Sequence, residues 1–257
     1  MTTVAFCAVS PGGRTPPGKP IWMRPTAVAG FRQLTDAVHA EGAAASVQIG
    51  HAGALANARE KQCTRHVADS PFQSNRNELS QEATRDDIRD VTAAHADAAL
   101  LAVESGFDAI EVHLGHNYFA SSFLSPLVNR RRDEFGGSLE NRAKVARGVV
   151  MAVRRALDRA GATHMAVTAK LNMTDGVRGG IAVDEALTTA KWLQEDGGLD
   201  ALELTAGSSL LNPMYLFHGE APVREFASVF SPPLSWGVRM IGHKFFCTTT
   251  PIVTPSY

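Results

Sequence analysis

The chain has 257 residues, of which 44% are hydrophobic and 20% are charged, as in ordinary globular proteins. Its 25 basic and 26 acidic residues give a formal net charge of -1, and no block of like charge stands out. This balance argues against nucleic acid or an acidic membrane surface as a partner. The length suits one large domain or two small ones, and a complete eight-stranded α/β barrel takes about 250 residues.

The cysteines and the N-terminal segment bear on the cellular compartment. Cys7, Cys63 and Cys247 are far apart and form no CxxC pair, so zinc ribbons and iron–sulfur clusters have no ligand set. Met1–Ser10 is apolar but has no basic residue before the apolar stretch, which makes it a poor signal peptide. No apolar run reaches the roughly 20 residues that span a bilayer. We therefore expect a soluble, cytoplasmic protein with reduced thiols and no membrane partner.

The first predicted elements are a strand, a helix and a second strand. The apolar run Thr3–Val9 predicts the first strand, and the turn Ser10–Gly13 ends it. A helix is predicted over Pro25–Glu41. One side of this helix carries the apolar residues Phe31, Leu34 and Val38. Gly42 supplies a helix-ending signal, and Ala45–Ile49 is the second strand.

A long polar loop, Gly50–Ala83, separates these elements from the rest. The next helix, Asp86–Ser105, carries apolar residues at helical spacing, and Thr84 or Asp86 is positioned to cap it. The remaining predicted elements are a strand at Ala109–His113, a helix at Leu139–Asp158, a strand at Met165–Leu171, a helix at Val183–Glu195 and a strand at Ala201–Leu204.

The alternation of strands and helices predicts a parallel sheet with right-handed crossovers. Residues 106–112 and 198–204 repeat one another, each joining a helix to a strand through Gly-x-Asp. A barrel and an open doubly wound sheet both fit this pattern, but no GxGxxG follows the first strand, so a Rossmann dinucleotide site lacks support. Polar residues follow four consecutive strands: Gln48 and His51, His113 and His116, Lys170 and Asn172, Glu203 and Thr205. This distribution favours an incomplete TIM (β/α)8-type barrel, with about five of the eight strands recognisable, because open sheets bind ligands mainly at one switch point.

The most informative polar residues are His113, His116 and Tyr118. Two imidazoles three residues apart, directly after a strand, can point into one pocket and donate hydrogen bonds to a carbonyl or nitro oxygen. A tyrosine hydroxyl nearby can deliver a proton to a carbanion. The histidines could instead ligate a metal, although this needs a third ligand that the sequence does not make obvious. They could also have purely structural roles in a loop.

The segment Glu111–Tyr118, Glu-Val-His-Leu-Gly-His-Asn-Tyr, resembles the signature of the NADH:flavin oxidoreductase / Old Yellow Enzyme family. The resemblance continues through residues 129–142, which end in Gly-Gly-Ser-Leu-Glu-Asn-Arg. It implies an FMN-dependent ene-reductase that reduces activated alkenes on a TIM barrel. It also implies that His113 and His116 hold the electron-withdrawing oxygen of the substrate, and that Tyr118 is the catalytic proton donor to the alkene carbon.

Two further residues match cofactor-binding positions of this family. Gln48 resembles the glutamine that hydrogen-bonds the pyrimidine edge of FMN, and Lys170 stands where the family usually has arginine. The implied reductant is NADH or NADPH, the implied partner is a small-molecule alkene or enone, and no metal is expected; a homo-oligomer would be compatible with the family. Taken without the resemblance, Gln48 reads as a strand-end cap and Lys170 as the partner of a core carboxylate such as Glu203. In an aldolase or isomerase barrel, Lys170 would instead form a Schiff base.

The chain also departs from the family pattern. Residues 1–245 are expected to form a partial FMN-binding barrel domain, followed by an atypical tail at residues 246–257. Strand Thr3–Val9 resembles the family's second strand, and no later segment resembles the strands that bind the FMN phosphate. Ala54 also stands where relatives often have arginine. Since five strands cannot close an eight-stranded barrel, open edges are expected. The alternative hypothesis is a truncated, inactive relative that acts at most as a partner-dependent fragment.

Overall fold

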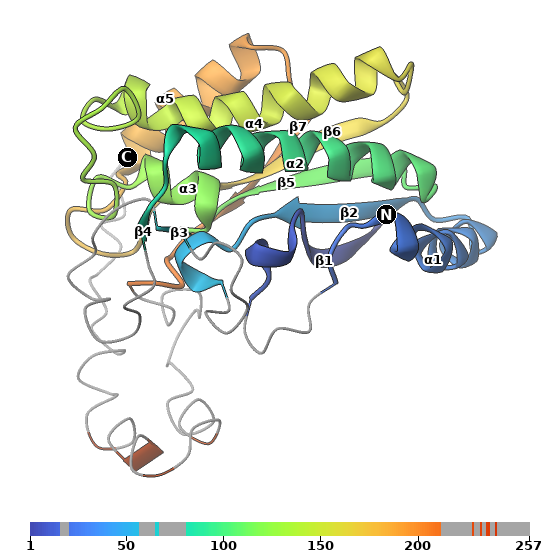
Figure 1. Cartoon of the computed structure of the whole chain (residues 1–257), viewed down its shortest axis with the longest axis horizontal. Coiled ribbons are helices and arrows are strands. Elements are labelled where there is room, and N and C mark those ends of the chain that lie inside the picture. Colours follow the sequence, from blue (N-terminus) through green and yellow to red (C-terminus); the bar gives the residue numbers. More distant parts are fainter. Residues whose placement is uncertain are drawn as a thin grey trace, which may run out of the picture.

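The computed structural model describes residues 1–15, 21–56, 65–66 and 81–211, together with residues 228, 232, 235–236 and 240. The atypical tail predicted at residues 246–257 lies outside this described part, as do Cys63 and Cys247. Within it, a parallel sheet is covered on one face by helices (Figure 1).

Five parallel strands form the main sheet, in the order β1-β2-β5-β6-β7. They are β1 (Thr2–Ala8), β2 (Ala45–Gly50), β5 (Ala109–Leu114), β6 (Ala166–Asn172) and β7 (Ala201–Thr205). All five predicted strands are therefore confirmed, with ends that differ by at most one residue. Each strand lies beside the next of these along the chain, as expected for consecutive βα units of a barrel.

The long loop predicted at Gly50–Ala83 is wrong in part. It contains a short 3-10 helix, η3 (Gly53–Leu55), and both strands of a second, two-stranded sheet. That small sheet pairs β3 (Arg65–His66) with β4 (Gln81–Glu82) in parallel. Two-residue strands leave almost no period for a sequence pattern to reveal.

The helices are α1 (Val28–Ala40), α2 (Arg85–Glu104), α3 (Phe119–Leu124), α4 (Leu139–Arg159) and α5 (Val183–Glu195). Helices α2, α4 and α5 lie side by side over one face of the sheet (Figure 1). Thr84 caps α2 with its hydroxyl and forms a capping box with Asp87, and Ser138 caps α4. Short helix α3 was not predicted. Among the described residues, none of the helices combines the length and hydrophobicity needed to traverse a bilayer.

Helix α1 differs from its prediction in detail. Pro25 begins a separate 3-10 turn, η2 (Pro25–Ala27), before the α-helix starts. Leu34 was expected on the buried side but is 37% exposed. Thr35 is fully buried in its place, because its hydroxyl donates to the backbone carbonyl of Ser105 at 2.7 Å. Gly42 ends the helix as predicted, with a φ of 72° that favours glycine.

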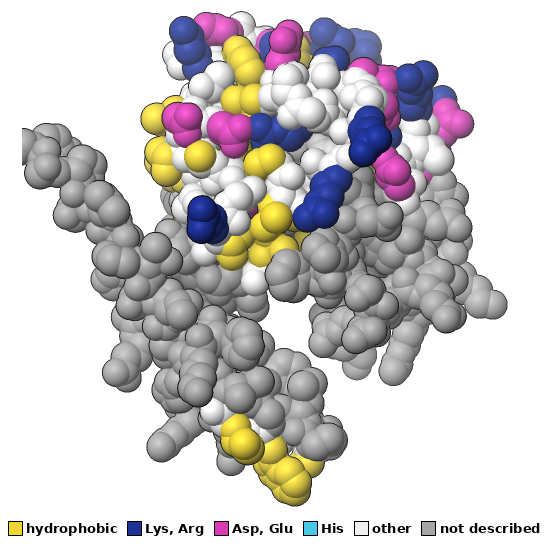
Figure 2. All heavy atoms as spheres, turned by 90° about the vertical axis from the view of Figure 1, so that its left-hand side faces the viewer, with side chains coloured by type: hydrophobic (Ala, Val, Ile, Leu, Met, Phe, Trp, Pro, Cys, Tyr) yellow, Lys and Arg dark blue, Asp and Glu magenta, His cyan; other side chains and the backbone are white. Residues whose placement is uncertain are grey.

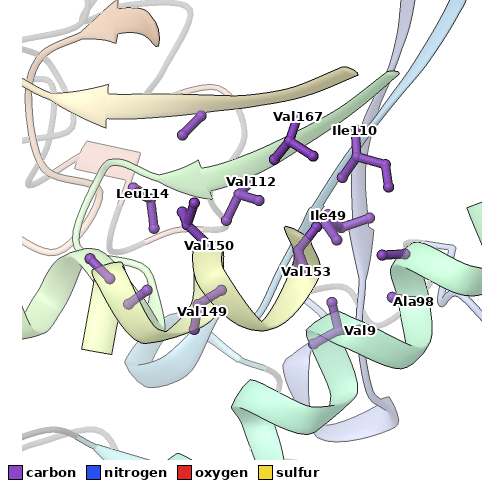
Figure 3. Packing of buried hydrophobic residues seen from close by; sticks show 14 of the residues in the cluster. Val9, Ile49, Ala98, Ile110, Val112, Leu114, Val149, Val150, Val153 and Val167 are labelled. Atoms are coloured by element: carbon purple, nitrogen blue, oxygen red, sulfur yellow. The ribbon is translucent and has the colours of Figure 1, made fainter. Parts of the chain in front are cut away.

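The hydrophobic core lies between the sheet and its helices. Alternate residues of the inner strands point to this side and are fully buried, including Ile110, Val112 and Leu114 of β5. Helix α4 packs Val149, Val150 and Val153 against them (Figure 3). Each such side chain stabilises the fold by about 1.5–3 kcal/mol through removal of apolar surface from water. Cys7 is also buried here, and burial raises the pKa of its thiol to about 12.

The repeated Gly-x-Asp junctions perform the same task twice. Asp108 accepts a hydrogen bond from the backbone N–H of Ala45, and Asp200 accepts one from the backbone N–H of Val167, each at 2.7 Å. In both cases the aspartate backbone N–H also donates to the carbonyl of the same partner residue at 2.8 Å. Each repeat unit therefore clamps the beginning of the neighbouring strand, β2 or β6.

The two edges of the described sheet are β1 and β7. Strand β7 is largely exposed, and Leu204 reaches 62% exposure. The five parallel strands correspond to part of a (β/α)8 barrel, with helices on one face of the sheet. The expectation of a partial barrel with five recognisable strands is confirmed.

Candidate active site

The inner face of the sheet carries a row of polar side chains near the carboxyl ends of the strands. Gln48 lies in register with Glu111, and His113 lies in register with Lys170, which pairs in turn with Glu203. Because these residues alternate with the buried apolar ones, all five point away from the helices. Four of the five predicted site residues belong to this face or follow it directly: Gln48, His113, His116 and Lys170.

Tyr118, the fifth predicted residue, joins the two histidines in one cluster. The ring centroids of His113 and His116 are 5.2 Å apart, and those of His113 and Tyr118 are 4.5 Å apart. Phe6, which the sequence did not single out, packs its edge against Tyr118 at 5.0 Å and against His113 at 5.9 Å. Gly50 makes this packing possible, since a Cβ there would come within 2.8 Å of the Phe6 ring.

Burial sets the protonation states of the cluster. It lowers the pKa of His113 to about 3, with help from the nearby His116 and Lys170. The pKa of His116 is lowered for the same reasons, burial first and Lys170 second. Burial raises the pKa of Tyr118. At neutral pH the cluster therefore consists of two uncharged imidazoles and an intact phenol.

His116 and its neighbour Asn117 form an unusual turn. Both adopt left-handed backbone conformations, with φ angles of 60° and 57°. Such a conformation costs about 1–2 kcal/mol for a residue with a Cβ, although asparagine tolerates it better than most. The turn brings the His116 Nε2 to 2.9 Å from the hydroxyl of Thr205 on β7. Strain of this kind persists only where surrounding contacts hold it.

Lys170 lies between two carboxylates. Its Nζ is 2.6 Å from Glu203 and 3.8 Å from Glu111, and Glu111 also accepts a hydrogen bond from the side-chain amide of Gln48. The pKa of Glu111 is raised, first by burial and then by the adjacent Glu203. The predicted contact between Lys170 and Glu203 is therefore confirmed. An ammonium held by carboxylates counts against a Schiff-base role, which needs a neutral amine.

The histidines that follow the strands differ in their surroundings. Among the described residues, no group of three His, Cys, Asp or Glu side chains is placed to hold a metal ion. His51, which also follows a strand, does not join the cluster. It is buried against Phe119, its Nδ1 accepts the backbone N–H of Gly53 at 3.0 Å, and burial lowers its pKa to about 3. His51 therefore supports the loop, whereas His113 faces the inner side.

Several residues of the site region were not predicted. Asn117, Asp175 and Ser208 form a buried polar network behind the histidine cluster. The only signal in the sequence is position: Asp175 and Ser208 come three residues after the ends of β6 and β7. Figure 2 looks onto the left-hand side of Figure 1 and shows acidic and basic side chains interspersed over the described part of that face.

Together, the fold and the site define a partial (β/α)8 barrel that gathers its polar side chains where the strands end. This is where barrel enzymes carry out their chemistry. Residues 1–205 match the NADH:flavin oxidoreductase / NADH oxidase family. The chain belongs to this family, and the family resemblance drawn from residues 111–118 is confirmed.

Individual relatives agree with this assignment. The chain is 48% identical over 248 residues to a 4,4'-dithiodibutanoate disulfide reductase of Rhodococcus erythropolis, covering 96% of this chain and 60% of that protein. It is 30% identical over 227 residues to an NADPH dehydrogenase of Halalkalibacterium halodurans, covering 88% and 64%. The structure of Old Yellow Enzyme from Pichia sp. AKU4542 superposes with a TM-score of 0.66 at 21% identity, over 79% of this chain and 57% of that one. The chain thus spans about three fifths of the length of these relatives.

Proposed function

We propose that this chain provides the substrate-handling part of an FMN-dependent oxidoreductase that takes hydride from NADH or NADPH and passes it to an activated alkene, such as an enone. The observation that carries the proposal is the cluster of His113, His116 and Tyr118 on the inner face of a barrel of this family. We assign residues 1–245 to one partial FMN-binding domain.

The residues present fit an FMN ring. Within the described part of the chain, the Nδ1 of His113 is buried and has no hydrogen-bond partner. This atom can therefore form a hydrogen bond with a bound molecule. Gln48 and Lys170 offer an amide and an ammonium on the same inner face, where the pyrimidine edge of a flavin needs donors. Lys170 would also offset negative charge on the ring. When bound, FMN supplies the hydride chemistry that amino-acid side chains lack.

The proposed roles of the cluster follow from its protonation states. His113 and His116, both uncharged, donate hydrogen bonds to the carbonyl oxygen of the enone and stabilise the negative charge that develops there. Tyr118 keeps its proton, since burial raises its pKa, and delivers it to the α carbon. Hydride reaches the β carbon, so one hydride and one proton convert the alkene into the saturated product.

A flavin titration tests this proposal. Purified full-length chain is mixed with FMN, separated from free FMN and reduced anaerobically with NADH or NADPH. We expect a flavin absorbance band that is bleached by the reductant and restored by an added enone. Protein that remains colourless would contradict the proposal and favour the inactive-fragment hypothesis. Flavin that is bleached but stays reduced in the presence of the enone would contradict alkene reduction.

Disulfide reduction is a second candidate, favoured by the 48% identity to a protein named as a disulfide reductase. One hydride and one proton would convert the disulfide into two thiols, breaking the S–S bond. The same anaerobic experiment separates the candidates when 4,4'-dithiodibutanoate replaces the enone as oxidant. Reoxidation by the disulfide with release of free thiol, and none by the enone, would assign the second function.

A further inference from the structure

The loop that follows β6 buries the carboxylate of Asp175, a residue that has no role in the proposed function so far. Asp175 is completely inaccessible to solvent, although it lies only three residues beyond the end of the strand. A buried carboxylate is costly unless it is hydrogen-bonded, so its partners indicate what it stabilises.

Asp175 accepts three hydrogen bonds. Its Oδ1 accepts from the side-chain amides of Asn117 at 3.1 Å and Asn172 at 2.9 Å. Its Oδ2 accepts from the backbone N–H of Ile181 at 3.0 Å. Gly180 leaves room for this arrangement, because a Cβ there would lie 2.6 Å from the Asp175 side chain. The loop at residues 172–181 therefore wraps closely around the carboxylate.

Asn117 links this carboxylate to the histidine cluster. It is the second of the two left-handed residues, and its Oδ1 accepts a hydrogen bond from the hydroxyl of Ser208 beyond β7. The neighbouring His116 is held from the same side, since its backbone carbonyl accepts from the N–H of Ser209 at 3.2 Å. The loops after β5, β6 and β7 thus meet at the Asn117 side chain.

We propose that Asp175 is a positioning residue of the proposed active site: through Asn117 it holds the left-handed turn that places His116 beside His113 and Tyr118. The inference rests on the proposed function for its catalytic consequence and on the hydrogen bonds alone for its structural part. Among the described residues, Asp175 makes no hydrogen bond to His113, His116 or Tyr118. It acts through the turn, which Asn172 also supports, because the Oδ1 of Asn172 accepts the backbone N–H of His116 at 3.5 Å.

The replacement Asp175→Asn tests the need for an acceptor at both oxygens. An amide has nearly the same shape, but one of its ends is an NH2 group that would face a donor, either the two asparagine amides or the Ile181 N–H. We expect the ring resonances of His113 and His116 to shift in the NMR spectrum of the histidine-labelled full chain without flavin, while those of His95 in α2 stay in place. Asp158→Asn, at an exposed position of α4, is the matched control and should leave all of them unchanged.

In the flavin-loaded chain, Asp175→Asn should lower kcat/KM for the enone by about 10²-fold, the typical effect of a misplacement near 1 Å, while FMN affinity stays within a few fold. Wild-type histidine resonances together with wild-type kcat/KM would overturn the proposal. If the wild-type chain takes up no FMN, the proposed function fails, yet the NMR comparison still decides the role of Asp175.

A milder variant keeps the proposal testable if Asp175→Asn does not fold. Asn117→Gly removes the side chain that Asp175 holds, and glycine adopts the required φ without strain. We expect this variant to fold and its His116 resonance to shift or broaden, because the turn is no longer tethered. A sharp His116 resonance at the wild-type position would show that the turn does not depend on the Asn117 side chain and would refute the proposal that Asp175 holds the turn through Asn117.

Discussion

The two faces of the same five strands serve different purposes. On the helix-covered face, alternate residues such as Val112 and Leu171 are fully buried and apolar. On the inner face, the residues in between include the partly accessible Gln48 and Lys170 and the buried Glu111 and His113, all of them polar. We therefore expect substitutions on the helix-covered face to lower the free energy of unfolding, and substitutions on the inner face to lower the proposed activity.

The largest expected effect comes from the inner side. Tyr118→Phe removes the proposed proton donor and leaves the ring that packs against Phe6. We expect kcat for alkene reduction to fall by about 10²–10⁴-fold. The free energy of unfolding in urea should change by less than about 1 kcal/mol. A decrease of clearly more than about 1 kcal/mol in the free energy of unfolding would contradict the proposed separation of the two faces.

A matched pair of leucines tests the helix-covered face. Leu171→Ala should lower the free energy of unfolding by about 2–5 kcal/mol, because its side chain is fully buried and leaves a cavity. Leu204→Ala on neighbouring β7 should change it by at most about 0.5 kcal/mol, since that side chain is 62% exposed. Comparable losses for the two would show that Leu204 is buried in the protein in solution.

A buried histidine makes the helix layer sensitive to acid. Burial lowers the pKa of His95 to about 4 in the folded chain, against about 6.5 when unfolded. Its contribution is therefore complete above pH 6.5 and is lost as the pH falls from 6.5 towards 4. We expect the free energy of unfolding to fall by about 2 kcal/mol between pH 7 and pH 5 because of His95. His95→Gln should reduce the loss by that amount in urea unfolding at the two pH values; an unchanged pH dependence would contradict the assignment.

The smallest expected effect lies away from both faces, at the start of α2. Thr84→Ala removes the hydroxyl that accepts the N–H of Asp87 at 3.2 Å. The free energy of unfolding should fall by about 1 kcal/mol, and kcat should stay unchanged. Thr84→Ser is the control, because it keeps the hydroxyl and should recover the stability. A changed kcat would connect α2 to the chemistry and weaken the contrast between the faces.

The fold could be predicted well where residues repeat with a clear period. The five strands and the helices α2, α4 and α5 follow from hydrophobic periodicity, and Thr84 was one of two candidate caps of α2. Leu34 and Thr35 show the limit of this approach. A single well-placed hydrogen bond buries the threonine, and the periodic pattern alone does not contain that information.

The site was predictable only in part, for a physical reason. His113, His116 and Tyr118 are close in sequence, so a short segment was enough to bring them together. The contact of Asn117 with Asp175 joins residues 58 positions apart, and the contact with Ser208 joins residues 91 apart. Such contacts depend on the order of strands in the sheet, which no local pattern specifies. The proposed roles of Gln48 and Lys170 stay predictions.

Asp108 and Asp200 also bear on how a barrel of this kind can evolve. Each aspartate fixes the alignment of its neighbouring strand from the end opposite the polar cluster. The alignment of β2 and β6 therefore does not rely on the loops that follow them. Those loops are free to accept insertions or new side chains while the sheet keeps its register, so a new substrate preference can arise without a new fold.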